Sequence, residues 1–297
     1  MQLYLVKTMD AFGAITDPER LFGRRCELEI IFHRLSSMQS TCIVGERGLG
    51  KSSLLYCIVQ GYRAHLAHPE RYAIAIFSPG RGAHLWREGE VLRLILLDML
   101  RTEPGSAISR RRWWLKRLQK ALKRGWQPDL ATFEHAIRDL ADEARPVLCL
   151  DDLDVLVTYR ARGQLGREFF ASWRSLAQTG RLAFVVTATR LPPELGEFLD
   201  IFRIIYLDRL RPEDARELAI SAGLSDHTQI RLALELGRGH PLALQTACAV
   251  IQAGKGMPRR EIIRAFNSAM GFSPLQAAWW RLAGWLNQHV GFHGAGL

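Results

Sequence analysis

The sequence is poor in cysteine, and its cysteines form no metal-binding pattern. There are five in 297 residues, an odd number, and no pair has CxxC spacing. Cys42 and Cys149 lie in apolar runs, which favours buried free thiols in a reducing compartment. The N-terminal stretch MQLYLVKTMD lacks the apolar run and cleavage site of a secretory signal. The most apolar stretch, 91–100, is interrupted by Arg93 and Asp98 and is too short to span a bilayer. We therefore expect a cytoplasmic protein.

Acidic residues are in the minority. The chain has 40 Lys and Arg against 30 Asp and Glu, which gives a formal charge of +10. A basic excess favours an acidic partner such as a nucleic acid, a nucleotide or an anionic lipid. The alternative, that the charge serves no acidic partner, stays open.

Short apolar runs alternate with longer helical patterns, and this alternation indicates an α/β sheet with helices on both faces. The runs are continuous rather than alternating, as expected for parallel strands that are buried on both sides. The predicted strands are 40–45, 72–78, 146–151, 182–188 and 202–207. The predicted helices between them are 24–37, 51–67, 85–103, 109–124, 129–144 and 163–178.

No strand pattern follows residue 208. Pro212 begins a helical stretch and is followed by Glu213 and Asp214, a favourable helix start. Further helices are predicted at 225–237, 240–254, 258–269 and 274–288. We predict an α/β domain over 1–207, with a basic helical insert at 105–127, and a smaller all-helical domain over 208–297.

A glycine-rich loop follows the first predicted strand and matches G-x-x-x-x-G-K-[ST]. Glycines allow positive φ and a close approach to phosphate, so the loop amides and the next helix N-terminus can bind an anion. The lysine can reach the β- and γ-phosphates, and the serine hydroxyl can ligate Mg²⁺. The alternative is a turn with a solvated lysine. The predicted nucleotide-binding residues here are Gly45, Glu46, Arg47, Gly48, Leu49, Gly50, Lys51, Ser52 and Ser53.

Two further strand ends carry polar side chains. PVLCLDDLD at 146–154 ends in Asp151, predicted to hold Mg²⁺ together with Ser52, and in Asp152, predicted to orient or deprotonate the attacking water. An ordinary acidic turn is the alternative. FVVTATR at 184–190 ends in Arg190, predicted to sense the γ-phosphate, and carries two hydroxyls within the strand.

These stretches together resemble the STAND branch of AAA-like P-loop ATPases, which includes the NACHT and NB-ARC switches. LFGRRCELEIIFHRL at 21–35 is similar to the F-G-R-E-x-E-L linker of these families, with Arg25 in place of the usual acid. The resemblance implies that Phe22, Gly23 and Arg24 lie against the adenine and ribose.

The resemblance extends to the helical part. TATR at 187–190 is similar to the family's sensor strand, and LDRLRPEDARELA at 207–219 resembles the start of its helical domain. GRGHPLALQTA at 237–247 resembles the G-x-P-L-A-L helix, which implies that Pro241 approaches the nucleotide. No repeat array and no M-H-D-like triplet is evident, so sensing and output are expected from partners in trans.

A basic segment with tryptophans, SRRRWWLKRLQKALKRGW, occupies 109–126. Its leucines recur at helical spacing, so one face is apolar and the other cationic. Trp113 and Trp126 can stack on bases. The basic face can bind the phosphate backbone of a nucleic acid, an anionic membrane or an acidic protein. It can also face solvent alone, and the sequence leaves these alternatives open. The eight cations are Arg110, Arg111, Arg112, Lys116, Arg117, Lys120, Lys123 and Arg124.

We expect a P-loop NTPase with a three-layer α/β/α domain, a central parallel sheet and a smaller helical domain. Its expected function is that of an ATP- and Mg²⁺-dependent molecular switch that hydrolyses ATP slowly or on stimulation. Binding is expected to change the domain arrangement and to gate self-association or partner binding. One alternative is a DNA-binding AAA+ ATPase of the origin-recognition or transposition-regulator type. Another is a scaffold that does not hydrolyse ATP.

Overall fold

The computed structural model describes residues 21–79, 86–101 and 110–280. Contacts divide the chain into two compact units. The sheet unit comprises Cys26–Gly45 and Lys51–Leu207, and the helical unit comprises Met1–Arg25, Glu46–Gly50 and Asp208–Leu297. Among the described residues, none of the helices combines the length and apolar character required to cross a bilayer.

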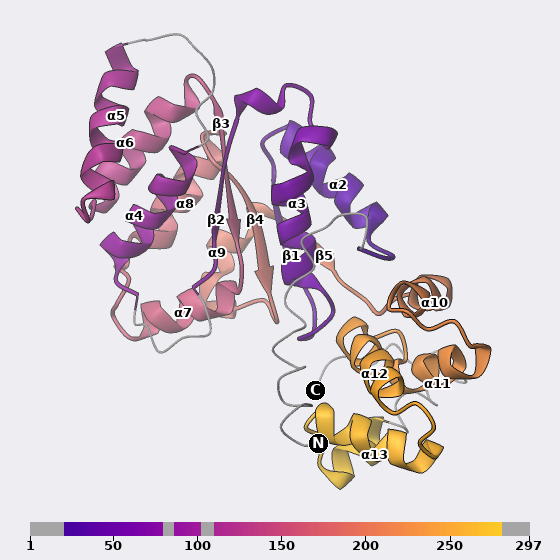
Figure 1. The fold of residues 1–297 in the computed structure, drawn as a ribbon. Coiled ribbons are helices and arrows are strands. Elements are labelled where there is room, and N and C mark those ends of the chain that lie inside the picture. Colours follow the sequence, from indigo (N-terminus) through magenta and orange to yellow (C-terminus); the bar gives the residue numbers. More distant parts are fainter. Residues whose placement is uncertain (1–20, 80–85, 102–109, 281–297) are drawn as a thin grey trace. The chain divides into compact units, whose positions relative to one another are not determined.

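The sheet unit contains a parallel five-stranded sheet in the order β2-β3-β4-β1-β5 (Figure 1). All five predicted strands are confirmed. Their residues are almost entirely buried, except in the edge strand β5, which explains the continuous apolar runs. The strands are β1 (Ser40–Val44), β2 (Tyr72–Phe77), β3 (Arg145–Leu150), β4 (Ala183–Ala188) and β5 (Phe202–Tyr206).

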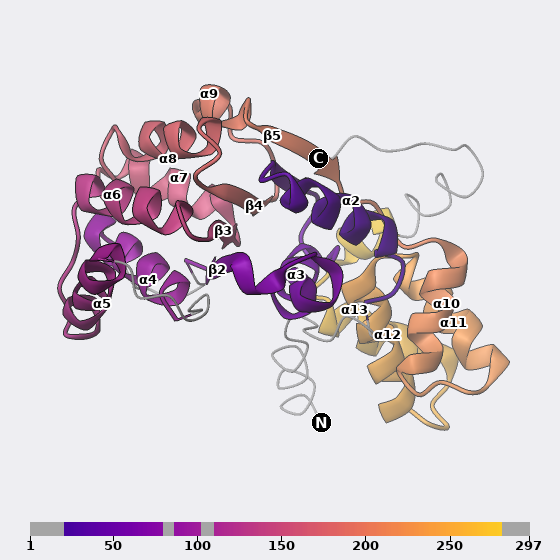
Figure 2. The ribbon, with the colours of Figure 1, turned by 90° about the horizontal axis from the view of Figure 1, so that it is seen from above.

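Helices cover both faces of the sheet, so the predicted three-layer α/β/α fold is confirmed (Figure 2). One face carries α2 (Arg25–Ser36) and α3 (Lys51–His65). The other face carries α4 (Glu88–Met99), α5 (Arg110–Lys123), α6 (Leu130–Ala141), α7 (Leu153–Ala161), α8 (Phe169–Gln178) and the short α9 (Gly196–Leu199). The described part of the unit also contains the 3-10 turns η2 (Pro69–Arg71) and η3 (Pro193–Leu195).

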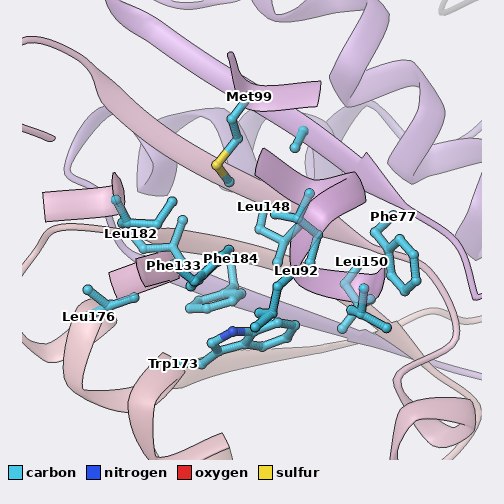
Figure 3. Packing of buried hydrophobic residues seen from close by; sticks show 14 of the residues in the cluster. Phe77, Leu92, Met99, Phe133, Leu148, Leu150, Trp173, Leu176, Leu182 and Phe184 are labelled. Carbon is cyan, nitrogen blue, oxygen red and sulfur yellow. The ribbon is translucent and has the colours of Figure 1, made fainter. Parts of the chain in front are cut away.

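An aromatic cluster fills the space between the sheet and this second helical layer (Figure 3). Trp173 of α8 is fully buried, and its ring centroid lies 4.3 Å from that of Phe169 and 5.6 Å from that of Phe184 on β4. Truncation of such a side chain to alanine costs about 3–5 kcal/mol. This core packs against β3 and β4 and so fixes the position of the polar residues at the carboxyl ends of these two strands.

The helical unit contains α10 (Pro212–Ser221), α11 (His227–Gly237), α12 (Pro241–Ala253) and α13 (Arg259–Ala269). These correspond to the predicted helices at 212, 225–237, 240–254 and 258–269. Pro212 and Pro241 occupy first-turn positions, where the missing N–H costs nothing. Residues 274–280 of the predicted helix 274–288 are helical, and 281–288 lie outside the described residues. The unit has its own apolar core, which includes Leu218, Leu244 and Phe266.

Three helices differ from the sequence prediction, and one of them, the short α9, was given no element there. The segment LDVLVTYRA, given no element in the sequence analysis, forms α7. It is short and rich in valine, so its helical period, carried by Leu153, Leu156 and Tyr159, is too brief to detect. The predicted helix 163–178 begins only at Phe169.

Candidate nucleotide-binding site

The glycine-rich loop leaves the carboxyl end of β1 and enters α3 at Lys51. Val44 pairs in register with Ala188 on one side and Tyr206 on the other, so the loop begins in the interior of the sheet. Gly48 and Gly50 have φ values of 83° and 94°. Only glycine adopts this region without a steric cost, which explains the second glycine of the motif, Gly50, and the additional glycine at position 48.

Lys51 is buried although it is charged, with 6% of its surface exposed. Its Nζ donates a hydrogen bond of 2.7 Å to the carbonyl of Gly45, at the opposite end of the loop. A buried ammonium requires such partners because desolvation is costly. This hydrogen bond joins the two residues that flank the loop within the sheet unit.

A carboxylate and two hydroxyls meet beside this lysine in the sheet unit. Asp151 follows β3 and is 5% exposed. Its Oδ1 accepts hydrogen bonds from Thr187 Oγ1 of β4 at 2.6 Å and from Ser52 Oγ of α3 at 3.1 Å. Ser52 and Asp151, predicted as metal ligands from sequence, are therefore brought together.

The middle of the loop belongs by its contacts to the helical unit. Three successive loop carbonyls each accept a hydrogen bond from that unit. Arg47 O is 3.0 Å from His240 Nε2, Gly48 O accepts from the N–H of Leu242 at 3.2 Å, and Leu49 O accepts from Arg24 Nη2 at 3.2 Å.

These contacts fix the direction of the loop amides. In a trans peptide the N–H points opposite to the C=O of the same peptide unit. With three carbonyls turned toward α12 and Arg24, the amides of Gly48 and Gly50 point the other way, while the Leu49 N–H donates to the Glu46 carbonyl at 3.5 Å. Backbone amides that point to one side can form a concave anion site.

A comparison with protein families identifies the class of protein. The model of the family Novel STAND NTPase 1 matches residues 7–192. The chain belongs to this family. The resemblance to STAND ATPases inferred from motifs is therefore confirmed, and the protein is an NTPase by family.

Solved structures support the fold of this STAND NTPase. A Walker-type ATPase of Pyrococcus abyssi is similar with a TM-score of 0.58 and 17% identity, over 93% of this chain and 78% of that one. Domain III of the replication initiation protein DnaA of Thermotoga maritima is similar with a TM-score of 0.50 and 16% identity, over 85% of this chain and 97% of that one. No curated protein matches the chain in sequence.

Asp152, the predicted water-positioning residue of the STAND NTPase, has left-handed backbone angles of φ 53° and ψ 62°. Its N–H donates to Thr187 Oγ1 at 2.9 Å. Such a conformation is uncommon for a non-glycine residue and is held here by its surroundings. Arg190, the predicted sensor, is exposed two residues beyond β4, near the strand end that pairs with Val44.

The predicted adenine-binding residues occupy the helical unit. Arg24 is 4% exposed, and the Nη2 that contacts the loop also donates to Asp208 O at 2.5 Å. Gly23 has a φ of 66°, and a Cβ there would lie 2.7 Å from Asp214 Oδ2. Phe22 packs against the helical core, and Pro241 is half-buried at the start of α12. Their contact with a base stays a prediction.

His240 has a role that sequence analysis did not assign. Its Nδ1 accepts from the N–H of Ala243 at 3.3 Å and caps α12, so the ring proton belongs on Nε2, which donates to Arg47 O. The ring is 5% exposed. A histidine directly before a first-turn proline was the available signal.

Three other residues near the site were given no role from sequence. Thr187 is a hydroxyl in an otherwise apolar buried strand, which was a usable signal. Asp154 accepts from the N–H of Thr189 at 2.7 Å and fixes the turn that leads to Arg190. Burial and then the charge of Asp151 raise the pKa of Tyr56 on α3, so this phenol stays protonated.

The donor set fits a magnesium ion. Ser52 Oγ and the Asp151 carboxylate are hard oxygen ligands on neighbouring elements, and Mg²⁺ is commonly held by one or two such groups together with substrate phosphates. The side chains of Glu46 and Arg47 are exposed, and the backbone carbonyl of Arg47 contacts His240.

Proposed function

We propose that this STAND NTPase binds ATP with Mg²⁺ at the loop 45–52, hydrolyses the γ-phosphate and reports the nucleotide state through its helical unit. The observation that carries the proposal is the orientation of the loop. Three loop carbonyls held by Arg24, His240 and Leu242 leave the amides of Gly48 and Gly50 pointing away from these partners, as phosphate binding requires. The match to the NTPase family supports nucleotide as the ligand.

Each polar group near the loop has a role in this proposal. Lys51 exchanges Gly45 O for phosphate oxygens, since an ammonium binds anions more strongly than a neutral carbonyl. Ser52 and Asp151 would hold Mg²⁺, which neutralises charge on the phosphates when bound. Thr187 orients the Asp151 carboxylate.

Asp152 accepts the proton of the attacking water, so that ATP and water yield ADP and phosphate. Arg190 approaches the γ-phosphate, and its exposure leaves it room to move. Phe22, Gly23, Arg24 and Pro241 bind the adenosine moiety.

The switch follows from the same hydrogen bonds. Phosphate binding changes the loop peptides, whose carbonyls are held by Arg24 and by His240 and Leu242 at the start of α12. ATP and ADP therefore stabilise different contacts within the helical unit, and this difference gates self-association or partner binding.

Nucleotide binding is tested by titrating the chain with a fluorescent ATP analogue in the presence of Mg²⁺. Lys51→Ala should weaken binding by about 1.5–3 kcal/mol, a factor of about 10 to 150, because a charged hydrogen-bond donor is lost. Lys255→Ala, an exposed lysine on the helical unit, is the matched control and should bind as the wild type does. If wild type and Lys51→Ala bound equally, the proposal would be wrong.

The switch is tested by amide hydrogen exchange and light scattering with ADP and with a non-hydrolysable ATP analogue. Amide hydrogen exchange at 46–50 and 240–244 should differ between the two nucleotides. The ATP analogue should also increase the molar mass measured by light scattering, because it promotes self-association. Asp152→Asn should bind ATP normally but release phosphate more slowly. Identical exchange and mass in both states would contradict the switch while leaving the binding result intact.

A further inference from the structure

Helix α5 uses one face to pack against the sheet unit. Leu115, Leu118 and Leu122 are buried in its core. Trp114 stacks on His135 of α6 at 5.0 Å between ring centroids, and its Nε1 donates to Asp139 at 2.6 Å. This apolar face is therefore occupied by the protein's own residues.

The opposite face of α5 is a row of exposed cations with one tryptophan. Its members recur at spacings of three and four residues, so they lie along one side of the helix. We name it the cationic stripe: Trp113, Lys116, Arg117, Lys120, Lys123 and Arg124. The side chains of Arg110, Arg111 and Arg112, also predicted to bind, lie outside the described residues.

In the described part of the chain, α5 has no acidic residue and the two on the adjacent α6 have other partners. The sequence has no acidic residue between Glu103 and Asp129. On the adjacent α6, Glu134 pairs with Arg138 at 2.8 Å and Asp139 accepts from Trp114. Positive charge thus accumulates along about 12 Å of helix, taken as the eight residues Lys116–Lys123 at 1.5 Å each.

The aromatic residues on this side are exposed although they are large. Trp113 is 63% exposed, and the Arg117 guanidinium lies over its ring at 5.4 Å from the centroid. Trp126, just beyond the helix, is 45% exposed. An exposed indole among cations provides an aromatic face beside phosphate-binding groups, the combination that binds single strands by stacking.

We propose that the cationic stripe, with Trp126, binds single-stranded nucleic acid. Lysines and arginines contact the phosphates while Trp113 and Trp126 stack on bases. A lipid surface is a poorer match, because an interfacial helix inserts its apolar face and the leucines of α5 are already buried. Duplex DNA is also a poorer match, because its stacked bases leave no face for the indoles.

The test is fluorescence anisotropy of a labelled dT20 oligonucleotide with the full chain, without nucleotide, over a salt series. The five described cations of the stripe account for a slope of log K against log salt of about −3.5. Lys116→Gln/Arg117→Gln/Lys120→Gln should lower this slope in magnitude by about 2. The charge-matched control, Lys255→Gln/Arg260→Gln/Arg264→Gln, changes exposed cations of the helical unit and should keep the wild-type slope.

The stacking part is tested by Trp113→Ala, which should weaken dT20 binding about five-fold or more, while Trp113→Phe retains most of it. Circular dichroism checks that both variants are folded, as expected for an exposed side chain. Equal loss in the two triple variants would mean that net charge alone acts and would overturn the proposal.

Two further results would also overturn it. One is binding to phosphatidylglycerol vesicles without binding to dT20. The other is duplex binding as tight as that of dT20 with no effect of Trp113→Ala. Since the measurement uses no nucleotide, Lys51→Ala should bind dT20 as the wild type does, which separates this inference from the proposed function.

Discussion

At the scale of single residues, Thr187 joins the two acidic residues of the site. Its hydroxyl donates to the Asp151 carboxylate and accepts from the Asp152 N–H, and the side chain is fully buried. One hydroxyl therefore orients the predicted metal ligand and holds the strained backbone of the predicted water-positioning residue. A buried hydrogen bond of this kind is costly to remove because its partners remain unsatisfied.

Thr187→Val tests this role with almost no change of shape. The free energy of unfolding should fall by about 1–3 kcal/mol, because an acceptor for the Asp152 N–H and a donor to Asp151 are lost. Phosphate release from ATP should fall as well. Thr189→Val is the control, since Thr189 is exposed and its backbone N–H makes the contact to Asp154. Equal effects of the two variants would contradict the role of Thr187.

At the scale of elements, the helices show which ends the sequence encodes locally. Asp129 caps α6, and its carboxylate accepts from the Thr132 N–H at 2.8 Å. Hydrogen bonds from the Thr132 side chain and backbone lower the pKa of Asp129. Asp226 caps α11 in the same way and accepts from the Gln229 N–H at 3.0 Å. Both caps need only residues within three positions, so they can be read from sequence.

The Asp129 cap gives a prediction with a pH signature. Asp129→Ala should lower the free energy of unfolding by about 1 kcal/mol at pH 7. Because the folded state lowers the pKa of Asp129, ionisation stabilises the fold above pH about 4, and this stabilisation disappears as the pH falls below that value. Urea titrations at pH 7 and pH 3 should therefore show a smaller difference from the wild type at pH 3. If Asp129→Ala lost more unfolding free energy at pH 3 than at pH 7, the assignment of Asp129 as an ionised helix cap would be wrong.

Strands and helices differed in how well sequence predicted them. The strands were found because burial on both faces demands continuous apolar runs. Helix α7 was missed because nine residues rich in valine carry little helical period. Its start depends on the left-handed angles of Asp152, which a contact with Thr187 stabilises.

At the scale of the whole molecule, the exposure of the cysteines shows which parts of each unit are packed. Cys42, Cys57 and Cys149 are buried in the sheet unit and Cys248 in the helical unit, while Cys26 is exposed. Burial, as the main cause, raises the pKa of Cys42, Cys149 and Cys248 to about 12. All five cysteines lie in the described part of the chain, and none of them is in a disulfide there.

A thiol reagent at pH 8 should therefore label one cysteine quickly in the native protein and all five after denaturation, because thiolate and access are both required. Cys26→Ser should remove the fast phase. The measurement is the absorbance of the released chromophore over time. A second fast thiol in the native protein would show that one unit opens more readily than its core packing indicates.

The sequence by itself determined the strands, the glycine-rich loop, the lysine and the acidic residues at the strand ends, since each is encoded by neighbouring residues through periodicity or local backbone demands. Only the tertiary structure decided which side chains form hydrogen bonds to the loop and to these acidic residues. Thr187 reaches Asp151 across 36 residues, and His240 reaches Arg47 across 193. Such contacts depend on how the chain packs, because a hydrogen bond requires a specific distance and angle that no local pattern specifies.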